Sequence, residues 1–368
     1  MPSTDQLTTQ LDRVASTDTG PFPVISLYLD LRPNEHGRDQ FEPFLRNELA
    51  NRIQTFAATS PERQSLDADA EKIQSHLAAI DGSVNGLALF ACHGADLFVP
   101  IELAAPIEGH RLYISDQPHL YPIARLIDEY PRYLALLTDS HSARIFVFAL
   151  NSVETTAQIE GQKTKHHKKG GWSQARYQRH VENFRLQHIK EVAEVVARIV
   201  RQESIDKVIL SAEEVVLAEI REQLPKEVLD RVVDSVNLGV HAAQHEVLES
   251  TLSALREKDA ETDRERVDAL IGAYRANGLG CVGVEATRRA FELGQVDELL
   301  ITATPDTLTA KGEANAAAAA AAERTPQERV ADELVLQARN TSAKIRFIED
   351  PALLAPFGGA GAFLRFKL

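Results

Sequence analysis

The chain has 368 residues, of which 44% are hydrophobic and 26% charged, values ordinary for a soluble globular protein with adequate cores. This length favours two or three domains rather than one. The formal net charge of -14 excludes attraction to nucleic acid over the whole surface, so any contact with RNA requires a local basic patch.

Cysteines and apolar segments indicate the compartment. Cys92 and Cys281 are far apart and no CxxC pair is present, so we expect two buried free cysteines, without a disulfide framework or a zinc site. No apolar run reaches the ~18 residues of a membrane-spanning helix, and the polar N-terminal stretch is unlike a signal peptide. The sequence predicts a cytoplasmic protein that needs no cofactor and no metal.

The first region, residues 1–130, is predicted to mix strands and helices. β-Branched and aromatic residues indicate strands, and apolar residues at helical spacing indicate helices. The predicted elements are a strand at 22–31, helices at 40–56 and 61–80, strands at 85–92 and 95–103, and a short helix at 121–132.

The second region, residues 131–238, continues this alternation, which favours an α/β fold. The predicted elements are a hairpin of strands at 133–138 and 143–150, helices at 175–202 and 214–224, and strands at 206–212 and 230–239. Asp139, Ser140 and His141 suggest a catalytic triad, but triad members come from separate elements. We therefore interpret them as the hairpin turn.

The third region, residues 239–368, is predicted to be a second small α/β unit, which a low-complexity stretch at 311–329 interrupts. The predicted elements are helices at 243–258 and 263–276, a helix that Gly294 ends before a strand, a helix and strand within 329–350, and a Gly-rich turn with an edge strand within 353–368. Gly278–Gly283 satisfies GxGxxG, but a helix rather than a strand precedes it. We interpret Gly278 as a helix cap.

A basic segment stands out in this acidic chain, which has 54 acids against 40 bases. Between residues 163 and 190 the only acid is Glu182, and the positive residues are Lys163, Lys165, Lys168, Lys169, Arg176, Arg179, Arg185 and Lys190. A solvated charge run is the usual interpretation of such a segment. The adjacent His166 and His167 lack a third ligand at zinc spacing, so no metal site is expected.

Three features of this segment favour RNA binding instead. Gly170 and Gly171 permit positive φ and close backbone approach. Trp172, the only tryptophan, is placed to stack on a base. Basic and aromatic residues then extend the patch along the first turns of a helix, namely Arg176, Tyr177, Arg179 and His180. Charge, glycines and an aromatic ring together fit a loop that follows phosphates.

At these residues the sequence resembles the archaeo-eukaryotic class of peptide-chain release factors and Pelota, in a divergent bacterial branch. In that family a Gly-Gly-Gln loop lies between a hairpin and a long basic helix. Residues 168–171 match the basic and Gly-Gly part, and residues 175–179 match the basic-aromatic part after it. Trp172 and Ser173 separate Gly-Gly from Gln174, a departure seen in the divergent branch.

The resemblance covers most of the chain and implies three domains. These are a release-factor-like N-terminal domain at 1–130, a middle domain with a mixed sheet and a long basic helix at 131–238, and an L7Ae/L30e-like α/β/α domain at 239–368. Residues 24–31, 283–301 and 357–366 carry the likeness outside the loop. The Asn-Ile-Lys-Ser motif of stop-codon recognition has no counterpart.

The resemblance implies hydrolysis of peptidyl-tRNA on stalled ribosomes. Gln174 would position the water, and Gly170 and Gly171 would allow the close approach. RNA-binding residues would be Lys163, Lys165, Lys168, Lys169, Trp172, Arg176, Tyr177, Arg179, His180 and Arg185. The implied partners are the ribosome, tRNA and a translational GTPase at the C-terminal domain. Two alternatives remain open, a ribosomal A-site binder without catalysis, for rescue recognition or hibernation, and a nuclease of the tRNA acceptor end.

Overall fold

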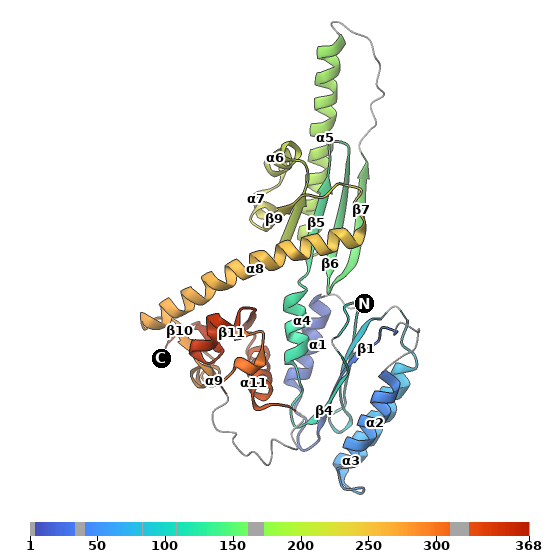
Figure 1. Ribbon diagram of the computed structural model, residues 1–368, viewed down its shortest axis with the longest axis vertical. Helices are drawn as coiled ribbons and strands as arrows, with labels where there is room; N and C mark the ends of the chain where they lie inside the picture. The colour runs from blue at the N-terminus through green and yellow to red at the C-terminus, as the bar shows by residue number, and fades with distance from the viewer. Residues whose placement is uncertain are drawn as a thin grey trace. The chain divides into compact units, whose positions relative to one another are not determined.

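The computed structural model describes residues 4–33, 41–82, 84–107, 109–160, 173–309 and 324–367, with side chains in the long helix α5 (Ser173–Gln202) from Asn183 onward. The chain forms two compact units (Figure 1). One combines Met1–Glu129 with Ala260–Leu368, and the other is Tyr130–Asp259. We call them the split unit and the inserted unit. No helix within the described ranges is long and apolar enough to cross a membrane.

The inserted unit is built on a mixed five-stranded sheet of order β7-β6-β5-β8-β9. Its strands are β5 (Tyr133–Thr138), β6 (Ser142–Ala149), β7 (Ser152–Glu160), β8 (Lys207–Ser211) and β9 (Val232–Val236). β5, β6 and β7 form an antiparallel meander, whereas β8 runs parallel to both β5 and β9. The helices of this unit are α5, α6 (Glu214–Gln223) and α7 (Lys226–Leu229), with the first half of α8 (Gln244–Arg275).

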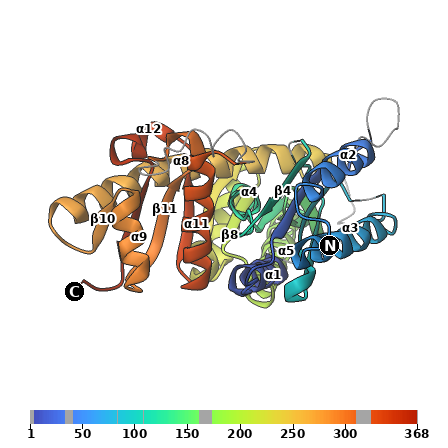
Figure 2. The same ribbon diagram turned by 90° about the horizontal axis from the view of Figure 1, so that it is seen from below.

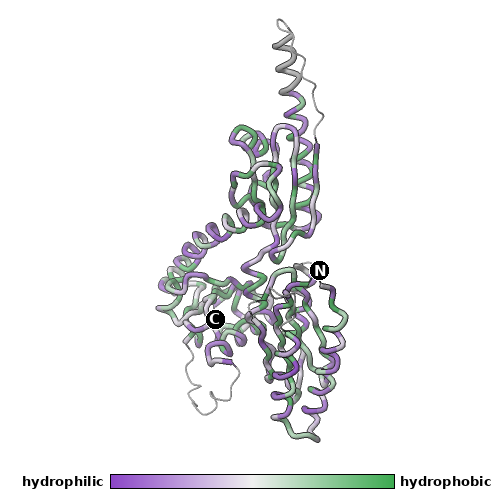
Figure 3. The backbone as a smooth tube through the Cα atoms, turned by 45° about the vertical axis from the view of Figure 1, so that its right-hand side comes forward, coloured by the Kyte–Doolittle hydropathy of each residue, from purple (hydrophilic) through white to green (hydrophobic). Residues whose placement is uncertain are grey.

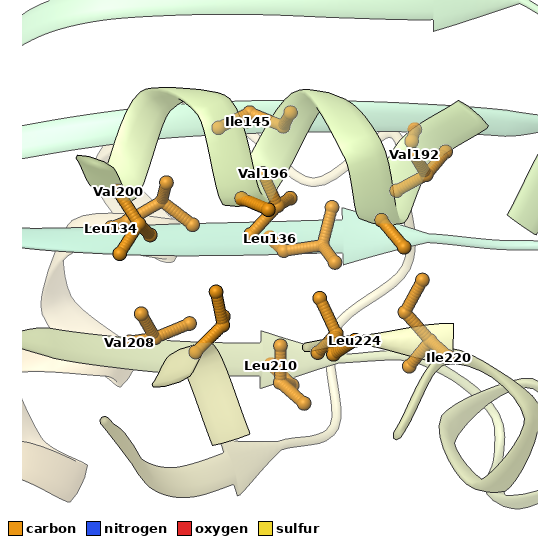
Figure 4. Packing of buried hydrophobic residues seen from close by; sticks show 14 of the residues in the cluster. Leu134, Leu136, Ile145, Val192, Val196, Val200, Val208, Leu210, Ile220 and Leu224 are labelled. Carbon is orange, nitrogen blue, oxygen red and sulfur yellow. The ribbon is translucent and has the colours of Figure 1, made fainter. Parts of the chain in front are cut away.

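Helix α5 packs on one face of this sheet through one apolar stripe. Val192, Val196 and Val200 are spaced by four residues, so they lie on one side of the helix. They meet β-strand residues such as Leu134 and Leu136 in a fully buried cluster (Figure 4). The opposite face of the sheet has its own core, to which the first half of α8 contributes. The sheet is therefore covered on both faces, and the C-terminal half of α5 supplies the helix residues of the core on one of them.

The N-terminal part of the split unit contains an antiparallel four-stranded sheet of order β3-β2-β1-β4. The elements are α1 (Thr4–Ser16), β1 (Val24–Asp30), α2 (Phe41–Ile53), α3 (Pro61–Leu77), β2 (Gly86–Cys92), the 3-10 turn η1 (His93–Ala95), β3 (Leu97–Leu103), β4 (Arg111–Ser115) and α4 (Tyr121–Glu129). Helices α2 and α3 contribute to the core on one sheet face. Ser60 accepts the Arg63 N–H at the start of α3, with Pro61 at the first helical position.

The C-terminal part of the split unit contains a sheet of order β10-β13-β11-β12. The elements are β10 (Gly280–Val282), α9 (Val284–Glu292), β11 (Val296–Thr302), η2 (Pro305–Thr307), α11 (Pro326–Asn340), β12 (Lys344–Ile348), α12 (Pro351–Leu354), η3 (Ala355–Phe357) and β13 (Ala360–Leu364). A capping box of Thr325 and Glu328 starts α11. This helix contacts α1 and α4 as well as its own sheet (Figure 2), so it joins the two parts of the unit.

The α/β fold class is confirmed, and several predicted details are wrong. The helices predicted at 243–258 and 263–276 are one continuous helix, α8, because no Gly or Pro interrupts the charged residues between them. β13 was predicted as an edge strand but pairs with β10 on one side and β11 on the other. Helix α1 and strands β4, β7 and β10 were not predicted. The three-domain boundaries stay a prediction.

Hydropathy follows these elements. In Figure 3 the segments that form the sheets are largely hydrophobic, whereas the helices alternate hydrophilic and hydrophobic turns. Leu7, Leu11 and Val14 of α1 show the same pattern, since they are spaced at helical intervals and are 0–2% exposed. The polar residues between them explain why this stretch was interpreted from sequence as a polar N-terminus.

Candidate functional site

Most of the predicted site residues precede α5 or lie in its first turns. Lys163, Lys165, Lys168, Lys169, Gly170, Gly171 and Trp172 fall outside the described residues. Gln174, Arg176, Tyr177, Arg179 and His180 belong to the helical backbone of α5, which begins at Ser173, but their side chains are outside the description. Arg185 is described completely. The assignment of these residues to catalysis and RNA binding stays a prediction.

The N-terminal half of α5 extends beyond the sheet of its own unit (Figure 1). Among its described side chains, Asn183 to Gln187 are exposed or half-buried, and burial begins at His188 and Ile189. At 1.5 Å per residue, the stretch from Ser173 to Gln187 measures ~22 Å. Gln174 and the basic residues after it therefore lie on a projecting helix and not on the globular surface.

Strand β7 leads toward this segment and was not predicted. A tight connection joins β6 to β7, in which Leu150 and Asn151 both have positive φ, at 47° and 60°. This backbone twist matches that of a two-residue hairpin turn, which usually carries Asn-Gly. Leu150-Asn151 is not a typical turn sequence, so the turn could not be recognised from the sequence. The strand after it was therefore not predicted.

The base of the projecting half of α5 is held by an ion pair with α6. The Arg185 guanidinium donates to the Glu219 carboxylate, and these side chains are 29% and 19% exposed. From the sequence, Arg185 was predicted to bind RNA and Glu219 was assigned no role. The one sequence feature that sets Glu219 apart is its position on α6, next to the buried residues Val216 and Ile220.

His188 lies one turn further along α5 and is 4% exposed. Neither ring nitrogen meets the geometry of a hydrogen bond within the described part of the chain. Burial lowers the pKa of His188, although the nearby backbone of Ser142 and the carboxylates of Glu191 and Asp139 oppose that change. The neutral imidazole therefore fills the space between α5 and the hairpin turn.

The hairpin turn is structural, as the sequence indicated. Asp139 Oδ1 accepts the N–H groups of His141 and Ser142, both at 2.7 Å, and the Ser142 hydroxyl lies 3.1 Å from both carboxylate oxygens. Burial would raise the pKa of Asp139, but these donors hold it below its ordinary value. The carboxylate is thus occupied by the turn itself, and the triad interpretation is excluded.

The remaining motifs also serve the fold. Gly278 donates its N–H to Ala273 O and Asn277 donates to Tyr274 O, the two bonds of a Schellman cap on α8. Asn277 takes the left-handed conformation at φ 55°, so the cap is confirmed with Asn277 in the place expected of glycine. Cys92 is buried and Cys281 half-buried, both as free thiols. The described residues hold no cluster of His, Cys, Asp or Glu arranged to bind a metal.

A buried polar cluster that the sequence did not suggest joins the two parts of the split unit. His119 Nδ1 lies 2.6 Å from Asp332 Oδ2, and Arg324 donates to the same oxygen at 2.6 Å. The backbone N–H of Tyr121 donates to Asp332 Oδ1 at 3.0 Å. His119, Arg324 and Asp332 are all less than 8% exposed. The three side chains and the Tyr121 N–H meet at one carboxylate, so the cluster links the two parts of the split unit.

Two protein families match consecutive parts of the chain. The family described as bacterial archaeo-eukaryotic release factor family 10 matches residues 118–256, which include α5 and its sheet. The family described as eRF1 domain 3 matches residues 260–368, which include β10 to β13. The two matched ranges follow one another with only a short gap.

Similar proteins are release factors and Pelota-type proteins. Peptide chain release factor subunit 1 of Thermococcus onnurineus is 24% identical over 330 residues, which cover 77% of this chain and 80% of the relative. The S. cerevisiae Dom34 structure, described as a translation termination-like factor, is 15% identical with a TM-score of 0.43 and covers 74% of this chain and 73% of its own. An archaeal Pelota described as ribosome-bound with ABCE1 is 13% identical, with a TM-score of 0.44, over 98% of this chain and 94% of its own. The resemblance to the archaeo-eukaryotic release factor class that the sequence indicated is thereby confirmed over residues 118–256 and 260–368.

Proposed function

We propose that this protein is a release-factor-like translation factor that hydrolyses peptidyl-tRNA on stalled ribosomes. The observation that carries the proposal is the projection of α5 beyond its sheet, with Gln174 as the second residue of the helix. The basic residues Arg176 and Arg179 follow Gln174 in the backbone of the same projecting helix. Such an element can enter a confined RNA site that a globular surface cannot reach. The Thermococcus relative is named as a peptide chain release factor.

Charge at the start of α5 supports binding of RNA phosphates. The first turn of α5 contains no acidic residue, so the partial positive charge of the helix N-terminus is not neutralised there. The lysines and arginines around residues 163–179 add to this charge within a chain of net charge -14. Phosphate contacts of this kind give affinity that falls steeply with salt.

The proposed chemistry assigns a positioning role to the amide of Gln174. A glutamine amide is too weak a base to activate water, but it can hold a water against the ester and exclude others. Backbone N–H groups beside Gly170 and Gly171 would stabilise the negative charge that develops on the carbonyl oxygen. The ester of the peptide with the tRNA ribose then breaks as water adds, which releases the peptide and leaves the tRNA hydroxyl.

One observation favours a second candidate function, binding to the ribosomal A site without catalysis. The backbone at Gln174 is already helical, and Trp172 and Ser173 separate it from Gly171. A glutamine fixed in a helix has less freedom to reach an ester than one in a loop. The family match of residues 260–368 to eRF1 domain 3 further supports docking of a translational GTPase there, in either case.

Replacement of Gln174 separates the two functions. We expect Gln174→Ala to lower single-turnover peptide release from stalled ribosomes by on the order of 100-fold, with unchanged co-sedimentation, because only water placement is lost. Gln187→Ala is the matched control, since Gln187 is an exposed glutamine of the same helix outside the proposed site. Equal release by both variants would contradict a catalytic role. Binding without release by the natural protein would establish the A-site binder.

A further inference from the structure

The base of the projecting helix concentrates buried polar atoms that lack partners. Ten buried side-chain nitrogen or oxygen atoms make no hydrogen bond within the described residues. Four of them belong to Arg185, His188 and Glu219, which lie within one turn of each other on α5 or directly across from it on α6. Buried polar groups are normally satisfied, so such a concentration calls for a functional explanation. We call these three residues the α5 base.

We propose that the α5 base sets the direction of the projecting helix, which makes Arg185 and Glu219 positioning residues for the proposed release reaction. Arg185 is the only charged residue among 183–187, the described side chains of α5 ahead of His188. Its ion pair with Glu219 ties the helix sideways to α6 at the point where core packing ends. His188, less than one turn further along α5, is buried at 4% exposure.

The distance between the α5 base and Gln174 makes its geometry important. Arg185 comes eleven positions after Gln174, which corresponds to ~16 Å of helix. A tilt of about 10° at Arg185 therefore moves the backbone of Gln174 by about 3 Å. A misplacement of about 1 Å can cost on the order of 100-fold in the rate of an enzyme reaction. A small change in helix direction after loss of the Arg185–Glu219 pair therefore becomes a displacement of several ångströms at Gln174.

The same contacts argue against Arg185 as a direct RNA contact, the role predicted for it from sequence. Its guanidinium is already paired with a carboxylate that is 19% exposed. Transfer of Arg185 to a phosphate would leave the Glu219 charge largely buried without a partner, which is strongly unfavourable. Arg185 thus has a carboxylate partner within the protein, and the proposed RNA contacts are limited to the basic residues nearer Ser173 in the sequence.

A charge-reversal series in the full-length protein tests this inference. Glu219→Gln removes the pair, and Arg185→Glu combined with Glu219→Arg restores it in the opposite sense. Glu222→Gln is the matched control, because Glu222 is an exposed glutamate of the same helix. Nitroxide labels on Ser173→Cys and on Thr155→Cys of β7, in a Cys281→Ser background, report the distance from helix tip to sheet by pulsed electron resonance.

We expect Glu219→Gln to broaden this distance distribution by several ångströms and to lower release in the unlabelled protein by 10- to 100-fold, with unchanged ribosome co-sedimentation. The double reversal should restore both readouts, and Glu222→Gln should change neither. An unchanged distance distribution in Glu219→Gln, or a double reversal that loses ribosome binding, would overturn the inference and return Arg185 to an RNA contact. The release readout rests on the proposed function. If the natural protein releases no peptide but the distances respond as expected, the proposed function fails and the positioning role stands.

Discussion

Asp69 offers a direct test of how burial acts in the N-terminal sheet. This carboxylate on α3 is 1% exposed, and its Oδ2 accepts the N–H of His93 at 2.8 Å in the turn between β2 and β3. Burial raises the pKa of Asp69 from 3.8 to about 6, although the His93 N–H and the charges of His93 and Lys72 act in the opposite direction. The folded protein therefore binds a proton at Asp69 more tightly than the unfolded chain does.

The sign of the pH dependence follows from this raised pKa. The contribution of Asp69 to the free energy of unfolding is fully present below pH 3.8 and is lost as the pH rises through about 6. A difference of about two pKa units corresponds to a free-energy change of about 3 kcal/mol. Asp69→Asn keeps a carbonyl oxygen for the His93 N–H but never carries the buried charge. We expect this variant to exceed the natural protein in stability by up to about 3 kcal/mol at pH 8, with the difference vanishing near pH 4.

Denaturant unfolding at pH 8, 6 and 4.5, followed by circular dichroism, measures this difference, and carboxyl carbon resonances give the pKa of Asp69 independently. Asp67→Asn on the same helix is the control, because Asp67 is exposed and its pair with Arg63 is worth under about 1 kcal/mol. Asp69→Asn would refute the reasoning if it were less stable than the natural protein at pH 8. A stability difference that does not vary with pH would refute it equally.

Two further predictions concern the split unit. Asp332→Ala should lower the free energy of unfolding of this unit by about 3–5 kcal/mol, because Arg324 would keep a buried charge without its carboxylate. Thermal denaturation followed by circular dichroism measures the loss, and a change under about 1 kcal/mol would contradict the buried cluster. Gly361→Ala should lower the free energy of unfolding by about 1–3 kcal/mol, because the new Cβ would lie 2.8 Å from the Leu270 side chain and 2.9 Å from Cys281 O. Gly82→Ala is the control in the same measurement, since a Cβ at Gly82 meets nothing within 4 Å.

Local patterns in the sequence predicted most elements of the inserted unit. The helical spacing of Ile189, Val192 and Val196 indicates α5, and the apolar runs around Asp139 indicate the β5–β6 hairpin. Both signals depend on residues close in the chain. The same patterns placed the basic segment between a hairpin and a long helix, and the resemblance to the release factors followed from that order.

Contacts between distant residues could not be predicted in this way. The partner of Arg185 is 34 residues away, and Asp332 is 213 residues from His119. A charged residue on a helix carries no sign of whether its charge meets solvent, RNA or a second helix, so Arg185 was assigned to RNA with its basic neighbours. Strand order is equally non-local, which is why β13 was placed at an edge although Gly361 and its small neighbours fit under Leu270 in the middle of the sheet.

The interior position of β13 has a consequence for the synthesis of this chain. A ribosome makes the protein from the N-terminal end, and β13 is the last strand in chain order among the described residues. β10 and β11 cannot be joined in one sheet until residues 360–364 have left the ribosome. The contact between His119 and Asp332 likewise cannot form until Asp332 has been synthesised. The inserted unit, by contrast, has all of its strands within residues 130–259. We expect it to fold before the C-terminal sheet of the split unit is complete, whereas the N-terminal sheet has all of its strands within residues 24–115 and does not depend on later residues.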